Sequence, residues 1–421
     1  MKKISFIQPS RNNLKYLKWS YNSIRKNLGT KHEICWADDC SNDGTWEWMM
    51  ETAKKDHNIK VMRNEGPERL GHTILYDKLV DIATNDIVMI YHADMYACPK
   101  LDEEMLKHLQ RGKVVSATRI EPPLHPDGPE KILMDFGIEP EEFDEQGLMN
   151  WLESDKDFQH SEITKGIFAP WVIYKDDFLA IGGHDPLYAP QSKEDSDIFN
   201  RFVLAGYDLI QTWRGFVYHM TCRGSRFKDG ALRNPAGQVF MKGRESDEWL
   251  KQNLRSTRNF IRKWGHMVKH DEMMKPIIPP KYDIGFVVHN CDANLLRELE
   301  PWCSCIYIKD TSIIVEYITE EQKNTDFDLT KRVKPYIDKV NKSADSLLKL
   351  NSRLKSSYEW KNHNILVEFD AQKLNANNFQ NVVNLSEILS NSGEIGKLEL
   401  EIFKFNVKSL ESYEKDLILV K

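Results

Sequence analysis

Two histidines and an aspartate have the residue types of a divalent metal site. His92 and Asp94 stand in YHADMY, at the end of the apolar run IVMIY, and His219 ends the run FVYH. Hard cations such as magnesium and manganese take carboxylate oxygens and keep positions for water and phosphate oxygens. An imidazole ligand favours manganese over magnesium. Asp94 and His219 therefore predict an open metal site, and the spacing leaves undecided whether His92 joins them.

A second group of acids, EDSD at residues 194–197, begins a segment with helical periodicity. A carboxylate in a partly dry site can take a proton from a hydroxyl group, because burial raises its pKa. Acids are also common in the first turn of any helix, since the helix dipole favours negative charge there. Asp195, with Glu194 beside it, is thus a candidate general base, and a non-catalytic helix N-terminus is the alternative.

Residues 222–244 form a basic segment that we expect to be a loop, and Arg223 and Arg226 lie in it. Guanidinium groups bind phosphate oxygens through paired hydrogen bonds, so this segment could hold a diphosphate as it becomes a leaving group. A solvated loop without such a role would have the same composition.

The order of the surrounding elements predicts an α/β fold. Apolar runs that read as strands alternate with segments of helical periodicity, at residues 3–7, 33–38, 59–64 and 87–91. This alternation predicts a mostly parallel central sheet flanked by helices, in which ligands bind beyond the carboxyl ends of the strands. Three polar clusters fall at that edge, at residues 8–12, 38–43 and 92–94.

The chain loses this regularity after residue 120. The runs DLIQT and FVYH predict two short strands, and a proline-containing linker is expected at residues 266–281. New strand-like runs, SIIVEYI among them, predict a separate smaller α/β or α+β domain at 282–421. The first domain then spans 1–265. The second offers no motif of known chemistry, so acceptor binding, homo-oligomerisation and docking of a partner enzyme all stay open for it.

Composition excludes some classes of function. A formal net charge of −6 argues against a mainly electrostatic attraction to nucleic acid or anionic lipid. We find no signal-peptide core and no run of 18 uninterrupted apolar residues, so no transmembrane segment is expected. The 7 cysteines are scattered, without a CxxC pair. They favour the reducing cytoplasm, with the protein either free or peripheral at the membrane.

Four segments resemble, in order, the signatures of inverting glycosyltransferases of family two, which have the GT-A fold. They are ISFIQPSRNN, ICWADDCSNDGT, NDIVMIYHADMY and FLAIGGHDPLYAPQSKEDSDIFNRFVLAGY. The second is the most specific match, and the resemblance covers roughly residues 1–230. It implies transfer of a sugar from a nucleotide-diphosphate sugar, by default a UDP-sugar, to a hydroxyl of a glycan.

The resemblance assigns the donor-binding residues. Pro9 and Ser10 would line the nucleotide pocket, and Asp39, with Asp38 beside it, would contact the base or ribose. Arg223 and Arg226 would hold the diphosphate. Many family members have Arg-Asn after the third strand, where this chain has YD at residues 76–77, so that part of the donor pocket is not assigned.

The resemblance also assigns the catalytic and metal-binding residues. Asp94 matches the last aspartate of the family's D-x-D motif, which binds the metal that bridges the donor phosphates. His92 replaces the first aspartate and is counted with the donor-binding residues. His219 stands where some members have a histidine ligand. Asp195 matches the general base of the E-D motif, with Glu194 as its neighbour.

The acceptor could be a surface polysaccharide, a lipid-linked glycan or a glycoprotein, and the sugar a hexose or an N-acetylhexosamine. Polysaccharide biosynthesis is the expected setting. Two other functions are considered. One is a catalytically inactive GT-A-like carbohydrate-binding or scaffold protein. The other is a sugar-phosphate nucleotidyltransferase, which is disfavoured because QPSRNN after the first strand contains no glycine.

Overall fold

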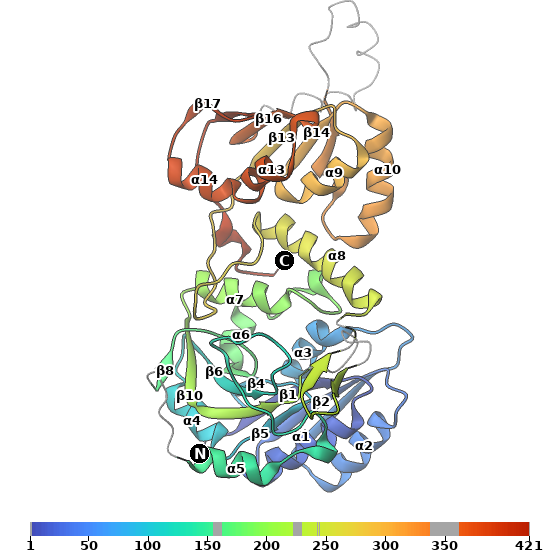
Figure 1. Cartoon of the computed structure of the whole chain (residues 1–421), viewed down its shortest axis with the longest axis vertical. Helices are drawn as coiled ribbons and strands as arrows, with labels where there is room; N and C mark the ends of the chain where they lie inside the picture. Colours follow the sequence, from blue (N-terminus) through green and yellow to red (C-terminus); the bar gives the residue numbers. More distant parts are fainter. Residues whose placement is uncertain are drawn as a thin grey trace, which may run out of the picture. The chain divides into compact units, whose positions relative to one another are not determined.

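The computed structural model describes residues 2–154, 162–221, 230–241, 243, 245–336 and 362–420 (Figure 1). The chain forms two compact units. The first comprises Met1–Asn253, Lys269–Ile277 and Ile418–Lys421, and the second comprises Leu254–Val268 and Ile278–Leu417. The expected domain end at residue 265 therefore lies within a stretch that belongs to the second unit. The expected linker is divided between the two units.

A 10-stranded sheet forms the centre of the first unit. Its strands are β1 Ile4–Ser10, β2 Glu33–Asp39, β3 Ile59–Asn64, β4 Ile87–Ile90, β5 Met95–Ala97, β6 Lys113–Glu121, β7 Lys131–Leu133, β8 Ile163–Thr164, β9 Trp171–Tyr174 and β10 Asp208–His219. The main order is β3-β2-β1-β4-β9-β6-β10-β5, with β7 beside β6 and β8 beside β10. Strands β1 to β4 pair in parallel, whereas β9 runs antiparallel to both of its neighbours. The predicted mostly parallel sheet is confirmed.

Helices cover both faces of this sheet (Figure 1). They are α1 Leu14–Asn27, α2 Thr45–Lys55, α3 Gly71–Ile82, α4 Leu101–His108, α5 Glu145–Glu153, α6 Lys175–Ala180 and α7 Glu194–Leu204, and the unit also contains the start of α8 Asp247–Trp264. Successive strand residues point to opposite faces. Phe6 accordingly packs in the core under α1, α2 and α4, and Ile7 packs in the core under α3, α6 and α7. The cores on the two faces of the sheet hold the strands in place, and the ends of these strands carry the residues of the candidate site.

Two expectations about the first unit need correction. DLIQT and FVYH belong to one strand, β10, whose pairing with β6 shifts register between Thr212 and Phe216. A β-bulge allows a strand to continue through such a shift. The segment expected to be a basic loop contains a short hairpin, with β11 at Ala231–Arg233 and β12 at Val239–Met241.

The second unit has its own mixed sheet. The strands are β13 Ile284–His289, β14 Cys305–Ile308, β15 Val333–Pro335, β16 Ile365–Asp370, β17 Gly396–Leu400 and β18 Phe403–Val407, in the order β15-β14-β13-β16-β18-β17. The helices are α9 Ala293–Leu299, α10 Thr311–Glu321, α11 Leu329–Arg332, α13 Ala376–Val383 and α14 Leu385–Ser392, and α8 continues into this unit. The expectation of a further α/β region is confirmed.

The prediction of a strand at SIIVEYI is wrong, because this run lies in α10. The side chain of Asp310 caps the helix by accepting hydrogen bonds from the backbone amides of Ser312 and Ile313. Ile314 and Tyr317 are buried at helical spacing, and Val315 is 65% exposed. No helix among the described residues has the length and hydropathy needed to cross a membrane.

Candidate active site

The H-x-D motif lies in a turn between two strands. Strand β4 ends at Ile90, residues 93–94 form a turn, and β5 begins at Met95. The buried Gln8 of β1 holds this turn by donating a hydrogen bond from Nε2 to the carbonyl oxygen of His92 at 2.9 Å. The sequence left undecided whether His92 joins Asp94, and this turn brings their side chains together.

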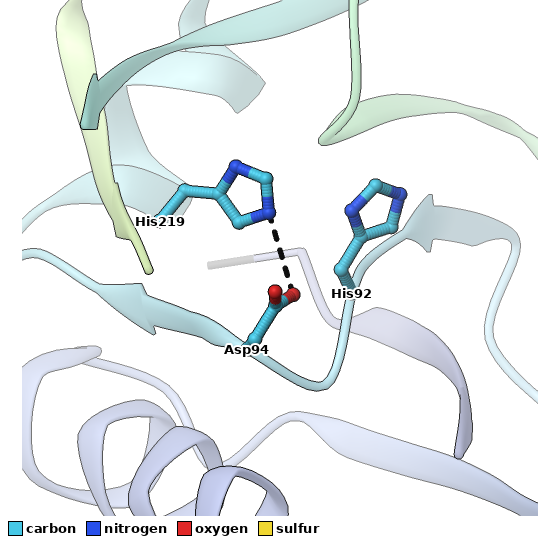
Figure 2. Close-up of side chains that lie close together, drawn as sticks. All are labelled: His92, Asp94 and His219. Carbon is cyan, nitrogen blue, oxygen red and sulfur yellow. Dashed lines mark ion pairs between the residues drawn. The ribbon is translucent and has the colours of Figure 1, made fainter. Parts of the chain in front are cut away.

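Strand pairing places His219 beside His92 and Asp94. Strand β10 runs antiparallel to β5, with His219 opposite Met95, and the backbone amide of Met220 donates to the carbonyl oxygen of Asp94 at 3.1 Å. The Nε2 atom of His219 lies 3.4 Å from a carboxylate oxygen of Asp94. Figure 2 shows the His219 and His92 rings on either side of this carboxylate. One ligand atom from each residue lies within 4.8 Å of the other two.

Glu121, at the end of β6, orients His219. The Nδ1 atom of His219 donates to a Glu121 oxygen at 2.7 Å, so Nε2 is the nitrogen that faces Asp94. Arg119 and Lys131 lie 3.2 and 3.5 Å from the Glu121 carboxylate. Burial raises the pKa of Glu121, but Arg119 and His219 outweigh it and hold that pKa well below its usual range. A carboxylate behind a histidine fixes the tautomer that a metal ligand needs.

The protonation of the three side chains follows from their surroundings. Burial and the nearby His219 lower the pKa of His92 to about 3, so its ring is neutral and has a free lone pair at neutral pH. Burial opposes the charge on His219, but the Asp94 and Glu121 carboxylates outweigh it and raise its pKa to about 9. Burial also opposes the charge on Asp94 and so raises its pKa, but the two histidines outweigh this effect and lower the pKa to about 2. A metal ion would therefore displace a proton from His219.

Two imidazole nitrogens and one carboxylate are a suitable ligand set for manganese and for other transition metals, and a poorer one for magnesium. All three residues line one cavity of about 920 Å³, so a metal bound to them would keep positions open toward the cavity. The chemistry of this ligand set fits a divalent ion.

The same cavity collects most of the predicted donor-binding residues. Pro9, Ser10 and Asp39 line it. Within the described part of the chain, the buried Ser10 Oγ and Arg11 Nε have no hydrogen-bond partner. Buried polar atoms are normally satisfied, so these atoms are available to a polar ligand.

Adjacent aspartates at the end of β2 face different surroundings. Asp39 lines the cavity and accepts hydrogen bonds from the backbone amides of Leu70 and Gly71, each at 2.9 Å. Asp38 is fully buried and pairs with Arg63 at 3.2 Å, and it is not among the described residues that line the cavity. Neighbouring strand residues point to opposite faces, so the structure brings only Asp39 to the cavity.

Helix α7 begins at the predicted catalytic acids. Glu194 is 5% exposed, and its Oε1 accepts a hydrogen bond from Nε2 of His72, on α3, at 2.5 Å. His72, Glu194 and Asp195 all line the cavity. Burial, followed by the charge of Glu194, raises the pKa of Asp195 to about 6. A carboxylate with this pKa is largely ionised at neutral pH and still binds protons well, as a general base requires.

Sequence reasoning missed Glu121 and His72. The only signal for Glu121 was an acid at the end of an apolar run, and no signal marked His72. Arg223 and Arg226 lie outside the described residues.

A second group with metal-ligating atoms occurs in the described residues, formed by Glu104, His108 and Glu162. These residues are not among those that line the cavity. Lys107 is already paired with the Glu162 carboxylate, so this group is primarily an ion-pair cluster.

Part of the chain matches a known protein family. Residues 5–158 match the family model described as "Glycosyl transferase family 2". Residues 5–158 thus form a glycosyltransferase family 2 domain, and the mostly parallel sheet agrees with the GT-A fold that the motifs predict.

Two solved structures are also similar. GalNAc-T7, crystallised with UDP, GalNAc and Mn2+, is 14% identical, with 62% of this chain and 48% of that chain covered and a TM-score of 0.43. TarS from S. aureus, residues 1–349, is 15% identical, with 52% of this chain and 60% of that chain covered and a TM-score of 0.37. The present chain thus spans about half the length of the first of these proteins.

Proposed function

We propose that the protein is a metal-dependent inverting glycosyltransferase that moves a sugar from a nucleotide-diphosphate sugar to a hydroxyl of a glycan acceptor. The observation that carries the proposal is that His92, Asp94 and His219 share one cavity with Asp195. A UDP-sugar is the default donor, because it is the common donor in the family. Manganese is preferred to magnesium because two of the three ligands are imidazoles.

The chain's own residues would divide the reaction as follows. Asp195 takes the proton of the acceptor hydroxyl, whose oxygen forms a bond to the anomeric carbon of the donor sugar. The bond from that carbon to the phosphate oxygen breaks, and its electron pair leaves with the nucleotide diphosphate. One displacement of this kind inverts the configuration. A divalent ion held by Asp94, His92 and His219 would neutralise charge on the leaving group.

The first test is calorimetric titration with UDP, GDP and dTDP, with and without manganese. We expect one nucleotide to bind in a manganese-dependent way, and Asp94→Asn to weaken that binding at least about tenfold, because it removes the carboxylate from the three ligands found among the described residues. His108→Gln is the matched control, since it alters the second histidine–carboxylate group and should leave nucleotide binding unchanged.

Once a nucleotide is found to bind, a screen of the sugars linked to that nucleotide, each tested with glycan acceptors, should identify the transferred sugar. If no nucleotide binds under any condition, the transferase proposal fails and a carbohydrate-binding or scaffold role takes its place. Binding that is unchanged in Asp94→Asn would contradict the metal assignment alone.

We also propose a cytoplasmic location, free or at the membrane surface, and a role for the C-terminal domain in acceptor binding or homo-oligomerisation. All cysteines in the described part of the chain are free thiols, which supports a reducing compartment. Fractionation of cells and light scattering of the purified protein would test the location and the oligomeric state. Recovery in a secreted fraction would contradict the former.

A further inference from the structure

His72 and the buried Glu194 form a part-buried contact beside the proposed general base. The two side chains meet at 2.5 Å, although the residues are 122 positions apart. Glu194 is 5% exposed, and within the described residues its second oxygen, Oε2, is buried without a hydrogen-bond partner. A buried carboxylate stays charged only when a cation or several donors stabilise it. The His72 imidazolium is the group in direct contact that can do so.

The backbone fixes His72 in this place. Gly71 donates its amide hydrogen to Asp39, and a Cβ at Gly71 would lie only 2.0 Å from the carbonyl oxygen of Pro190. Thr73 donates from Oγ1 to the same oxygen at 3.4 Å. The start of α3 is therefore held closely against the loop that leads into α7, and this packing keeps the backbone of His72 beside Glu194.

We propose that His72 is a positioning residue for sugar transfer, which holds Glu194 as a charged carboxylate so that Asp195 alone of the two acids accepts the acceptor's proton. The inference rests on the proposed function and adds that the two adjacent acids have different roles: Glu194 stays charged, and Asp195 accepts the proton. Without His72, two adjacent carboxylates would compete for one proton, as close acid pairs do.

The charges around Asp195 support this division. They are Glu194 on its own helix, His72 on α3, His184 after α6 and Arg119 on β6. Burial raises the pKa of Glu194, but His72 outweighs it and the pKa is lowered. Burial lowers the pKa of His72, but Glu194 outweighs it and the pKa is raised. Each partner thus stabilises the charged form of the other.

Opposite shifts of the pH profile distinguish this role from a merely structural one. In His72→Gln the lost positive charge should raise the proton affinity of the acid pair and move the acid limb of kcat/KM up by about 1 pH unit. In Glu194→Gln the lost negative charge should move the limb down, because the effect of Glu194 on Asp195 exceeds that of His72. The double variant should lie between the two single variants.

The profiles are to be measured at saturating manganese, with nucleotide affinity at pH 7.5 as the check of folding. His108→Gln provides the same chemical change outside the cavity and should leave the limb in place. If His72→Gln does not fold, the test rests on the direction in which the acid limb of kcat/KM moves in Glu194→Gln. Limbs that do not move, or that move the same way in both variants, overturn the inference. A wild-type protein that neither binds nucleotide nor transfers sugar overturns the proposed function instead.

Discussion

Replacing Asp195 by asparagine should stabilise the protein at neutral pH while it abolishes transfer. Burial and the adjacent Glu194 raise the pKa of Asp195 to about 6, so the ionised form is unfavourable in the folded state. Asparagine has nearly the same shape and no charge. Catalytic groups are often held in such unfavourable surroundings, and their removal then increases stability.

The pKa change gives the sign and size of the effect. The pKa rises from 3.8 to about 6, so the folded state binds this proton more tightly than the unfolded chain does. Well below pH ~4 the acid is protonated in both states and costs nothing. The cost grows between pH ~4 and ~6 and is complete above pH ~6, where it reaches about 3 kcal/mol. Asp195→Asn should recover up to this amount at pH 7.5 and less than about 1 kcal/mol at pH 4.

Urea denaturation at both pH values, followed by tryptophan fluorescence, measures this difference, and Trp171 is a fully buried reporter in the same unit. The matched control is Asp208→Asn, the same change at an exposed carboxylate, which should alter the free energy of unfolding by less than about 0.5 kcal/mol. If Asp195→Asn brings no gain at pH 7.5, or the same gain at both pH values, Asp195 is not held in a site that disfavours its charge. Its assignment as the base would then lose its physical support.

Three further changes test other parts of the structure. Glu121→Gln should weaken manganese affinity about 10 to 100-fold, because the Glu121 carboxylate orients His219. Calorimetry in the presence of nucleotide measures this affinity, and an unchanged value would contradict the role of Glu121. Gly183→Ala should lower the urea midpoint more than Gly206→Ala, since both have positive φ but only at Gly183 would a Cβ lie 2.2 Å from a carboxylate oxygen of α3. Glu300→Gln should cost about 3 to 5 kcal/mol in the second unit, measured by denaturation, because it leaves the buried Arg262 under-neutralised; a neutral effect would show that the network relaxes.

The sequence predicted the elements and residues whose placement depends on local pattern. Apolar runs located the early strands, and polar residues at their ends located Ser10, Asp39 and Asp94 at one edge of the sheet. The E-D motif located Asp195 at the start of a helix. The sequence pattern alone gave the wrong prediction where a run of residues could form either a strand or a helix. The run SIIVEYI is rich in β-branched residues, yet it forms α10 because Asp310 caps the helix and one face packs into the core.

Only the tertiary structure decided which side chains meet. Strand alternation requires Asp38 and Asp39 to face opposite ways, but the packing of β2 determines that Asp39 is the one in the cavity. Glu121 and His219 are 98 residues apart, and they meet because β6 and β10 pair in parallel. His72 meets Glu194 because α3 packs against the loop before α7. The sequence by itself therefore determined which groups are available for chemistry. The pairings that set their charge and orientation depend on strand register and helix packing, which join residues too distant in the chain to leave a local pattern.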